Sequence, residues 1–434
     1  MTPAAPRGRA ATTRLELIIG KGGVGKTTLA CASAIAAVQA GQRVLVASVD
    51  QAHSLGDVWG VRIDHDPGTI AGIVGVAPDL DVIEIDSLAL LEDRYRDVTR
   101  TLSGAGHDHG IDVTALDPAE LTGLPGVQEL LALTEIAQFA DADDWDLIVV
   151  DCPPSADMLR IVTAPDTLLG YLERVWPAHA RVLSATGGDV RRAVLAATTE
   201  RIAAAVTAVR DLLADPRRTG TRLITGPERV ALAEAARMHS AAALLGLRLD
   251  EVVVNKVLAP VPPAAETGIP HPAVQWYLRQ RAEQLEVITE LRARMPGVPV
   301  TIAHHTGPEP VGRRALAELA QGLSVRGNPA DGASDPMLGA TTPEPGDAAG
   351  EPQVRWESGT GLESVYTLRM RLPVVDPGTV RLGRVEDDVI VGADGVRRRL
   401  RLAPVLRRCT VEGAELDGEH LVVRFRPDPE VWPR

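Results

Sequence analysis

A glycine-rich segment with two lysines is the part of the sequence best suited to chemistry. Residues 20–28 are GKGGVGKTT, which satisfies the phosphate-binding pattern G-x-x-x-x-G-K-[ST]. Gly22, Gly23 and Gly25 can adopt φ > 0, and with Val24 they let backbone N–H groups close around phosphate oxygens. The segment therefore predicts a nucleoside-triphosphate site.

The residues after the glycines supply charge and a metal ligand. Lys26 can bridge the β- and γ-phosphates, and the Thr27 hydroxyl can ligate Mg²⁺. With Thr28 they stand at the start of a predicted helix over 27–40, whose positive dipole end faces the phosphates. We predict that this loop binds ATP with Mg²⁺; the alternative is a glycine-rich turn that binds nothing.

A second lysine, Lys21, directly follows the first glycine of the loop. Lys26 already serves the phosphates within one subunit, so Lys21 has no evident local task. A cation at this point could contact the nucleotide of a second subunit, as an arginine finger does in trans. The alternative is a solvated surface lysine.

Three aspartates are placed to handle magnesium and water. Asp50 follows the predicted strand 43–49, and Asp151 ends the apolar strand 146–151. Carboxylates at the carboxyl ends of parallel strands line the crevice where ligands bind, and Asp151 can hold a Mg²⁺-bound water as a Walker B residue does. Asp57 is a candidate to orient the attacking water. The alternatives are a strand-end turn for Asp151 and a helix cap for Asp57.

The elements that position these residues alternate between short apolar runs and longer helical patterns, which is typical of a parallel sheet covered by helices. The predicted strands are 15–20, 43–49, 81–85, 146–151, 221–225, 250–255 and 299–303, and the predicted helices are 27–40, 126–141, 189–214, 228–245 and 274–294. Two longer inserts, about 86–125 and 157–220, predict a helical subdomain. The sequence thus predicts an α/β fold, a mostly parallel P-loop sheet with helices on both faces and a helical insert.

The predicted domain boundaries follow changes in composition. Residues 1–13 predict a disordered tail, and residues 14–325 the P-loop ATPase domain. Over 326–360, Gly, Pro, Ala, Ser, Asp and Glu dominate, which predicts a flexible linker. Residues 361–434 alternate apolar and polar side chains around turns such as 392–395, which predicts a small all-β sandwich.

Charge and composition exclude several classes of protein. The net charge of −13 argues against a protein that coats nucleic acid. We expect no membrane span, since no run of about 18 apolar residues occurs, and no signal peptide. The three cysteines lie far apart without a CxxC pair, which is typical of a reducing cytoplasm and disfavours a zinc clasp. We therefore expect a cytoplasmic protein.

These motifs together resemble the ArsA-like family, which includes the arsenite-pump ATPases and the ATPases that deliver tail-anchored membrane proteins. The resemblance covers about residues 14–325, and the stretch 365–426 resembles the small-heat-shock (α-crystallin, HSP20-like) sandwich of some bacterial members. The segments that carry it are DQAHSLGD at 50–57 (similar to switch I, with Gln51 in place of proline), DCPPSADMLR at 151–160 (switch II), LPGVQELLAL at 124–133, VVVNKV at 252–257 and PEPVG at 308–312.

The resemblance implies a nucleotide-sandwich homodimer, with two chains required because this sequence has one P-loop. By it, Lys21 would contact phosphate across the interface, Asp57 would activate water, and Asp151 would organise the switch beneath Mg²⁺. Asn255 would contact adenine, and the loop containing Pro308 would lie on the other side of the base.

The sequence departs from the family pattern in ways that bear on function. Ala156 and Asp157 replace the usual glycine and histidine of switch II. We therefore expect the switch II hinge, which couples hydrolysis to movement, to be stiffer. Metalloid-binding cysteines are not apparent, which weighs against stimulation by arsenite. Only six methionines occur, and adaptable apolar clefts tend to use more.

Three functions remain open. The first is a nucleotide-switched enzyme that couples MgATP hydrolysis to the handling of a protein client. The second is a chaperone or targeting module for hydrophobic segments, regulated by ATP. The third is the soluble subunit of an anion pump, which needs a membrane partner. A partition-type ATPase is disfavoured by the acidic charge and by the lack of a basic carboxyl-terminal helix. The terminal β domain could also be an interaction module unrelated to chaperoning.

Overall fold

The computed structural model describes residues 12–50, 52, 54–63, 72–103, 127–186, 190–261, 271–305, 307–324 and 352–432. Residues 1–11 of the predicted tail, most of the predicted linker, part of the insert 86–125, and Gln51 and His53 of the switch I segment lie outside the described residues.

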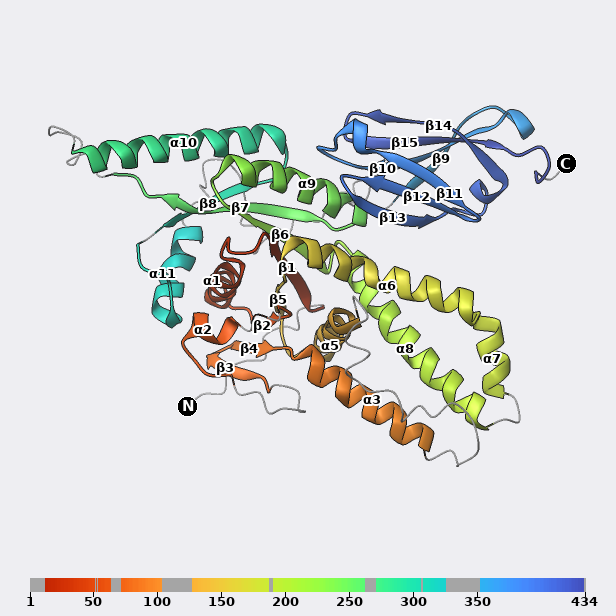
Figure 1. Cartoon of the computed structure of the whole chain (residues 1–434), viewed down its shortest axis with the longest axis horizontal. Coiled ribbons are helices and arrows are strands. Elements are labelled where there is room, and N and C mark those ends of the chain that lie inside the picture. Colours follow the sequence, from red (N-terminus) through yellow and green to blue (C-terminus); the bar gives the residue numbers. More distant parts are fainter. Residues whose placement is uncertain are drawn as a thin grey trace.

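An eight-stranded sheet forms the centre of the molecule (Figure 1). Its order is β3-β4-β2-β5-β1-β6-β7-β8, and all neighbours are parallel except β3 and β4. The strands are β1 Arg14–Gly20, β2 Val44–Ser48, β3 Val74–Ala77, β4 Leu80–Glu84, β5 Leu147–Asp151, β6 Thr219–Thr225, β7 Leu249–Leu258 and β8 Val300–His305. The predicted mostly parallel sheet is confirmed, and the antiparallel edge strand β3 is an addition to it.

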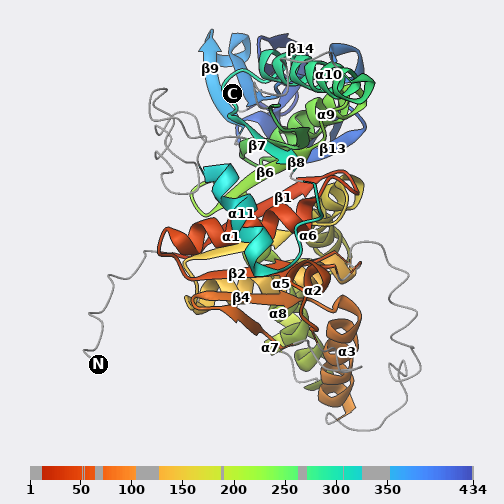
Figure 2. The same ribbon diagram turned by 90° about the vertical axis from the view of Figure 1, so that its left-hand side faces the viewer.

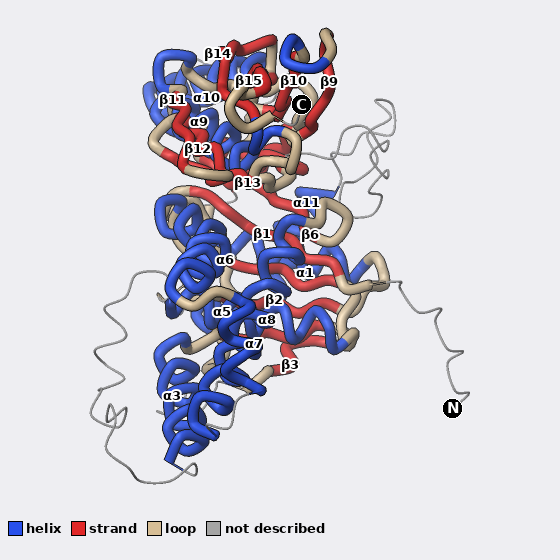
Figure 3. The backbone as a smooth tube through the Cα atoms, turned by 90° about the vertical axis from the view of Figure 1, so that its right-hand side faces the viewer, coloured by secondary structure: helices blue, strands red, loops and turns tan. Residues whose placement is uncertain are grey.

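Helices cover both faces of this sheet, as predicted. They are α1 Lys26–Gln39, α2 Leu55–Trp59, α3 Ser87–Ser103, α5 Val127–Ala142, α6 Ser155–Val175, α7 Ala178–Thr186, α8 Val190–Ala214, α9 Arg229–Leu245, α10 Pro272–Arg294 and α11 Gly312–Ser324. Helices α1, α2 and α11 pack on one face and α5, α6, α8, α9 and α10 on the other (Figure 3).

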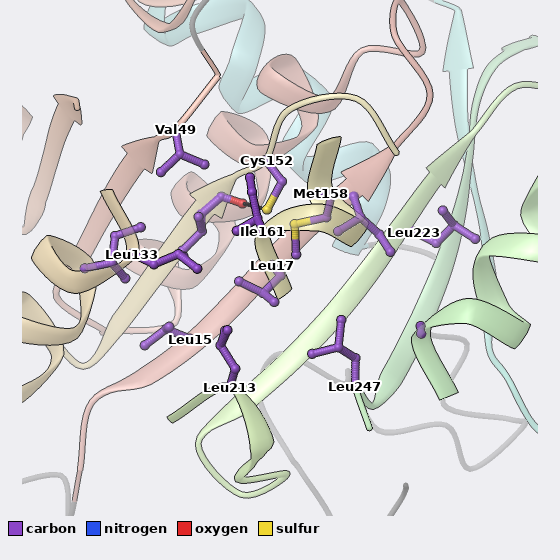
Figure 4. Close-up of a cluster of buried hydrophobic side chains, with 14 of the residues drawn as sticks. Leu15, Leu17, Val49, Leu133, Cys152, Met158, Ile161, Leu213, Leu223 and Leu247 are labelled. Atoms are coloured by element: carbon purple, nitrogen blue, oxygen red, sulfur yellow. Dashed lines mark hydrogen bonds between the residues drawn. The ribbon is translucent and has the colours of Figure 1, made fainter. Parts of the chain in front are cut away.

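The strands β1, β2 and β5 form because most of their side chains are apolar, chiefly β-branched or leucine, and are buried on both faces of the sheet. Figure 4 shows part of the core on the α6 side, where Leu17 of β1 meets Met158 and Ile161 of α6. The carboxyl ends of β1, β2 and β5 are thereby fixed side by side, and the loops that follow them must lie together.

Helices α3, α6, α7 and α8 extend beyond the sheet as the helical insert (Figure 1). Apolar side chains remain exposed on it, most of all Val175 at 64% and Leu183 at 70%. None of the described helices is both long and apolar enough to cross a membrane.

Residues 352–432 form the all-β domain, which has two antiparallel sheets with the orders β14-β15-β10-β9 and β11-β12-β13. Its strands are β9 Gln353–Ser358, β10 Val365–Arg371, β11 Arg381–Val385, β12 Asp388–Ala393, β13 Val396–Arg401, β14 Cys409–Asp417 and β15 His420–Pro427. The predicted sandwich is confirmed. Strand β9 lies within the range that composition assigned to the linker.

The β domain lies beside the β6–β8 end of the sheet and packs on α9 (Figure 2). Leu244 of α9 belongs to the apolar core of the β domain, and the Arg398 guanidinium donates to the Leu244 carbonyl oxygen at 2.9 Å. Arg398 thereby satisfies a backbone acceptor at the carboxyl end of α9, where a cation is favourable.

Candidate nucleotide-binding site

The glycine-rich loop joins β1 to α1, and Gly23 and Gly25, but not Gly22, have positive φ. Gly25 precedes α1 with a φ of 92°, in the left-handed region, and a Cβ there would lie 2.5 Å from Nδ2 of Asn255. Gly20 has a φ of 150°, and a Cβ there would clash with the carbonyl oxygen of Ile224. Both positions therefore require glycine. By contrast, Gly22 and Gly23 are exposed, so their backbone is accessible to a ligand.

The first residues of α1 point toward the ends of β2 and β5. The Thr27 hydroxyl donates to Oδ2 of Asp151 at 2.7 Å, and the Ser48 hydroxyl reaches the same oxygen at 3.3 Å. The Ser54 hydroxyl lies 3.2 Å from that of Thr27. Since the one Thr27 proton goes to the carboxylate, Ser54 donates in this second pair. One lone pair of the Thr27 oxygen stays available.

Lys26 is nearly enclosed, with 6% of its surface exposed. Its ammonium donates to the carbonyl oxygen of Lys21 at 3.4 Å, so the side chain curls back beneath the loop. A buried cation beside backbone N–H groups at a helix start favours an anionic ligand.

Asp151 is fully buried, and its Oδ1 has no hydrogen-bond partner among the described residues. Loss of solvent raises the pKa of this carboxyl to about 6, against the opposing effects of the Thr27 hydroxyl and the Lys26 ammonium. An uncompensated buried carboxylate oxygen is costly unless a cation or a bound water approaches it.

The same residues fit a magnesium ion bound mainly through water and phosphate. Thr27 offers a free lone pair, and Asp151 offers an unpartnered oxygen for a metal-bound water. In the described part of the chain, no three His, Cys, Asp or Glu side chains gather closely enough to hold a metal by themselves. Asp50 lies near enough to raise the pKa of Asp151, and its Oδ1 accepts from the Ala52 N–H at 3.1 Å.

Lys21 points away from its own loop. Its side chain is 60% exposed, and its ammonium lies 3.8 Å from the Glu234 carboxylate on α9. Both residues line a cavity of about 270 Å³ between the loop, the start of α6 and α9. The structure thus does not bring the Lys21 ammonium together with the Lys26 and Thr27 side chains.

Asn255 and Lys256, near the end of β7, reach the loop from the other side. Nδ2 of Asn255 donates to the Val24 carbonyl oxygen at 2.8 Å, and the Lys256 ammonium donates to that of Gly23 at 2.8 Å. Asn255 therefore contacts the phosphate loop itself, a contact that the sequence did not suggest.

The remaining predicted residues lie at the rim of the site. Asp57 is exposed on α2, three residues after Ser54, and the Gly56 N–H that precedes it donates to the buried Glu84 carboxylate at 2.9 Å. Pro308 is exposed in the loop between β8 and α11. Among the described residues, neither Asp57 nor Pro308 is hydrogen-bonded to the glycine-rich loop.

The sequence analysis assigned no role to Ser48, Ser54, Glu234 or Lys256, although Ser54 and Lys256 lie in segments that carry the family resemblance. Ser48 and Glu234 belong to no motif, so their contacts depend on the fold. Lys256 had a detectable sequence signal, because only three of the 45 basic residues of the chain are lysines.

Comparison with known families agrees with this geometry. The sequence profile of the anion-transporting ATPase family, ArsA, matches residues 13–324. The chain belongs to this family. A second profile, the HSP20-like domain found in ArsA, matches residues 363–425 and coincides with the β domain.

Two relatives of this anion-transporting ATPase family member match nearly its whole length, and a third matches part of it. Protein Rv2184c of Mycobacterium tuberculosis is 44% identical over 98% of this chain and 99% of that protein. Protein SCO2128 of Streptomyces coelicolor is 35% identical over 97% of this chain and 99% of that protein. The arsenical pump-driving ATPase of Escherichia coli is 30% identical over 69% of this chain and 48% of that protein.

Proposed function

We propose that this family member is a molecular switch that binds MgATP, hydrolyses it to ADP and phosphate, and works as a homodimer. The observation that carries the proposal is the bond from Thr27 to the buried Asp151, whose second oxygen is unpartnered. This pair joins the phosphate loop to the end of β5 and leaves two oxygen positions for a hydrated magnesium ion.

Each residue of the loop then has a task in binding. The backbone N–H groups of residues 22 to 28 hold the phosphates, and Lys26 neutralises their charge from below. When bound, Mg²⁺ supplies further charge neutralisation to the β- and γ-phosphates. The Thr27 hydroxyl keeps its hydrogen bond to Asp151 and presents its oxygen to the magnesium ion. Asp50 and Asp151 orient metal-bound water at the ends of β2 and β5.

Asp57 is the proposed residue that orients the attacking water. It is exposed and lies one helical turn after Ser54, which contacts the Thr27 hydroxyl at 3.2 Å. The start of helix α2 therefore lies next to the proposed magnesium site. A movement of this helix would carry Asp57 toward the γ-phosphate.

Lys21 is the proposed contact across the dimer. Within its own subunit it pairs with Glu234 at a distance of 3.8 Å and with 60% of the side chain exposed. An exposed pair of this kind is weakly held and easily exchanged for a phosphate of a second chain. Asn255 and Pro308 remain the proposed residues on either side of the adenine.

The helical insert is the proposed client surface. Leu168, Tyr171 and Val175 are spaced by three and four residues on α6 and are exposed, as are Val182 and Leu183 on α7. Exposed apolar side chains at helical spacing suit an apolar segment of another protein. This favours client handling as the function coupled to ATP.

An anion-pump subunit is the second candidate, and it rests on the family. The cysteines give it little support, because Cys31, Cys152 and Cys409 are all buried. Burial raises the pKa of the Cys31 and Cys152 thiols, which disfavours the thiolate that a metalloid would bind.

A subunit-mixing experiment tests the proposed dimer. Lys21→Ala and Asp57→Asn chains are each expected to hydrolyse MgATP poorly on their own. If Lys21 acts in trans and Asp57 in cis, a mixed dimer has one complete site, and an equal mixture should recover about a quarter of wild-type turnover. If the mixture stays as inactive as its components while light scattering shows exchange of subunits, the trans role of Lys21 is wrong.

A further inference from the structure

The chain contains 45 basic residues, of which only Lys21, Lys26 and Lys256 are lysines. Two of them belong to the phosphate-binding motif. The third is distant in sequence, yet its ammonium lies 2.8 Å from the carbonyl oxygen of Gly23. All the lysines of the protein therefore meet at one loop.

Lysine suits this position better than arginine. Gly23 presents one carbonyl oxygen, and a compact ammonium can donate to it from several directions. A guanidinium is a wide planar fork that fits paired acceptors such as carboxylate and phosphate. A single carbonyl can also accept from a guanidinium, as that of Leu244 does from Arg398, so what favours lysine at 256 is the small size of the ammonium.

Lys256 makes this contact from a strained backbone conformation. Its φ is 60°, in the left-handed region, where a residue with a long side chain pays a conformational cost. The register of β7 against β8 shifts between Val254 and Val257, so a bulge contains Asn255 and Lys256. The Lys256 N–H bonds to Oδ1 of Asn255 at 2.9 Å, which fixes the bulge.

The bulge holds two consecutive carbonyl groups of the phosphate loop. Asn255 binds that of Val24, and Lys256 that of Gly23, each at 2.8 Å. In a trans peptide the N–H points opposite to the C=O. With the carbonyls held on the β7 side, the N–H groups of Val24 and Gly25 point to the opposite side, as a phosphate cradle requires.

We propose that Lys256 is a positioning residue for nucleotide binding, which acts by clamping the Gly23 carbonyl so that the loop N–H groups are ready for phosphate. The inference rests on the proposed MgATP binding. Lys256 should therefore affect the affinity for the phosphates equally for every nucleotide base.

The test compares Lys256→Gly with the wild type. Glycine adopts φ of 60° without strain, so the variant removes the ammonium and keeps the bulge. Glu386→Gly is the matched control, because Glu386 also has positive φ (53°) but lies in the β domain. Binding of fluorescent ATP and GTP analogues with Mg²⁺ is titrated, and the melting temperature of the nucleotide-free proteins is measured.

Lys256→Gly should weaken both nucleotides by about tenfold, the effect of losing one charged hydrogen bond. In hydrolysis, KM should rise with kcat little changed, and the free protein should melt no lower than the wild type. Lys256→Arg should bind with intermediate affinity. If Lys256→Gly does not fold, Lys256→Asn takes its place, since asparagine tolerates the left-handed region.

Binding within about twofold of wild type would overturn the inference. So would a loss restricted to adenine nucleotides, which would mean that Lys256 contacts the base, or a loss that comes with a lower melting temperature, which would mean a general structural role. A wild-type chain that binds no nucleotide would instead refute the proposed function itself.

Discussion

The buried Asp151 carboxylate should destabilise the nucleotide-free protein when it is ionised, and magnesium binding should offset this destabilisation. Burial raises its pKa to about 6 in the nucleotide-free protein, whereas an unfolded aspartate titrates near ~3.9. Because the folded state holds the proton more tightly, the ionisation of Asp151 destabilises the fold as pH rises from about 4 to about 6, and the penalty is constant above that.

The size of this penalty follows from the shift. Two pKa units correspond to about 3 kcal/mol in the free energy of unfolding at pH 8. Asp151→Asn removes the charge and keeps an oxygen that can accept from Thr27, as Oδ2 does at 2.7 Å. The variant should therefore be more stable than the wild type by about 2–3 kcal/mol at pH 8, with no difference below pH ~4.

The assay is urea unfolding without metal or nucleotide, followed by tryptophan fluorescence, to which the buried Trp59 and Trp145 of the ATPase domain contribute. MgATP should then raise the midpoint of the wild type by mass action and leave the variant almost unchanged. A variant that is less stable than the wild type at pH 8, or a difference that does not change with pH, would refute the electrostatic reasoning at Asp151.

Three further predictions follow from the structure. Asp57→Asn should lower the rate of MgATP hydrolysis by about a hundredfold or more. Nucleotide affinity should stay unchanged, because Asp57 is exposed and lies outside the loop. Equal losses in rate and affinity would contradict this. Arg398→Ala should destabilise the docking of the β domain by about 1–2 kcal/mol, seen as a lower calorimetric transition, because it removes the 2.9 Å bond to the Leu244 carbonyl. Leu183 is 70% exposed, so Leu183→Ser should leave MgATP hydrolysis intact and reduce the binding of an apolar peptide, measured by fluorescence anisotropy. A loss of hydrolysis with peptide binding preserved would contradict the proposed client surface.

The central sheet could be predicted because its strands are buried on both faces. In β1, β2 and β5 most buried positions are apolar, with Glu16, Ser48 and Asp151 as the exceptions, so a short apolar run with a turn beyond it is sufficient. Strand β3 lacks this pattern, since Val74–Ala77 is an edge strand with no fully buried residue. Strand β9 was missed for the same reason, because nearly all of Gln353–Ser358 is exposed and its flanking sequence resembles a linker.

The candidate site was predictable as far as its motifs extend. The sequence places Lys26 and Thr27 after the loop and Asp151 at a strand end, and the order of the sheet brings them together. The clamp by Asn255 and Lys256 depends on a register shift between β7 and β8, which side-chain patterns do not encode. The exposure of Tyr171 and Leu183 depends on which helix faces are covered, and spacing alone does not decide this.

The proposed nucleotide site is tested most directly by measuring phosphate release from ATP and Mg²⁺ by the purified chain and by Lys26→Ala. Lys26 is 6% exposed at the start of α1, beneath the position proposed for the phosphates. We predict Mg²⁺-dependent release by the wild type and its loss in the variant, with the nucleotide-free melting temperature preserved. Undiminished hydrolysis by Lys26→Ala would contradict the assignment of Gly20 to Thr28 as the nucleotide site.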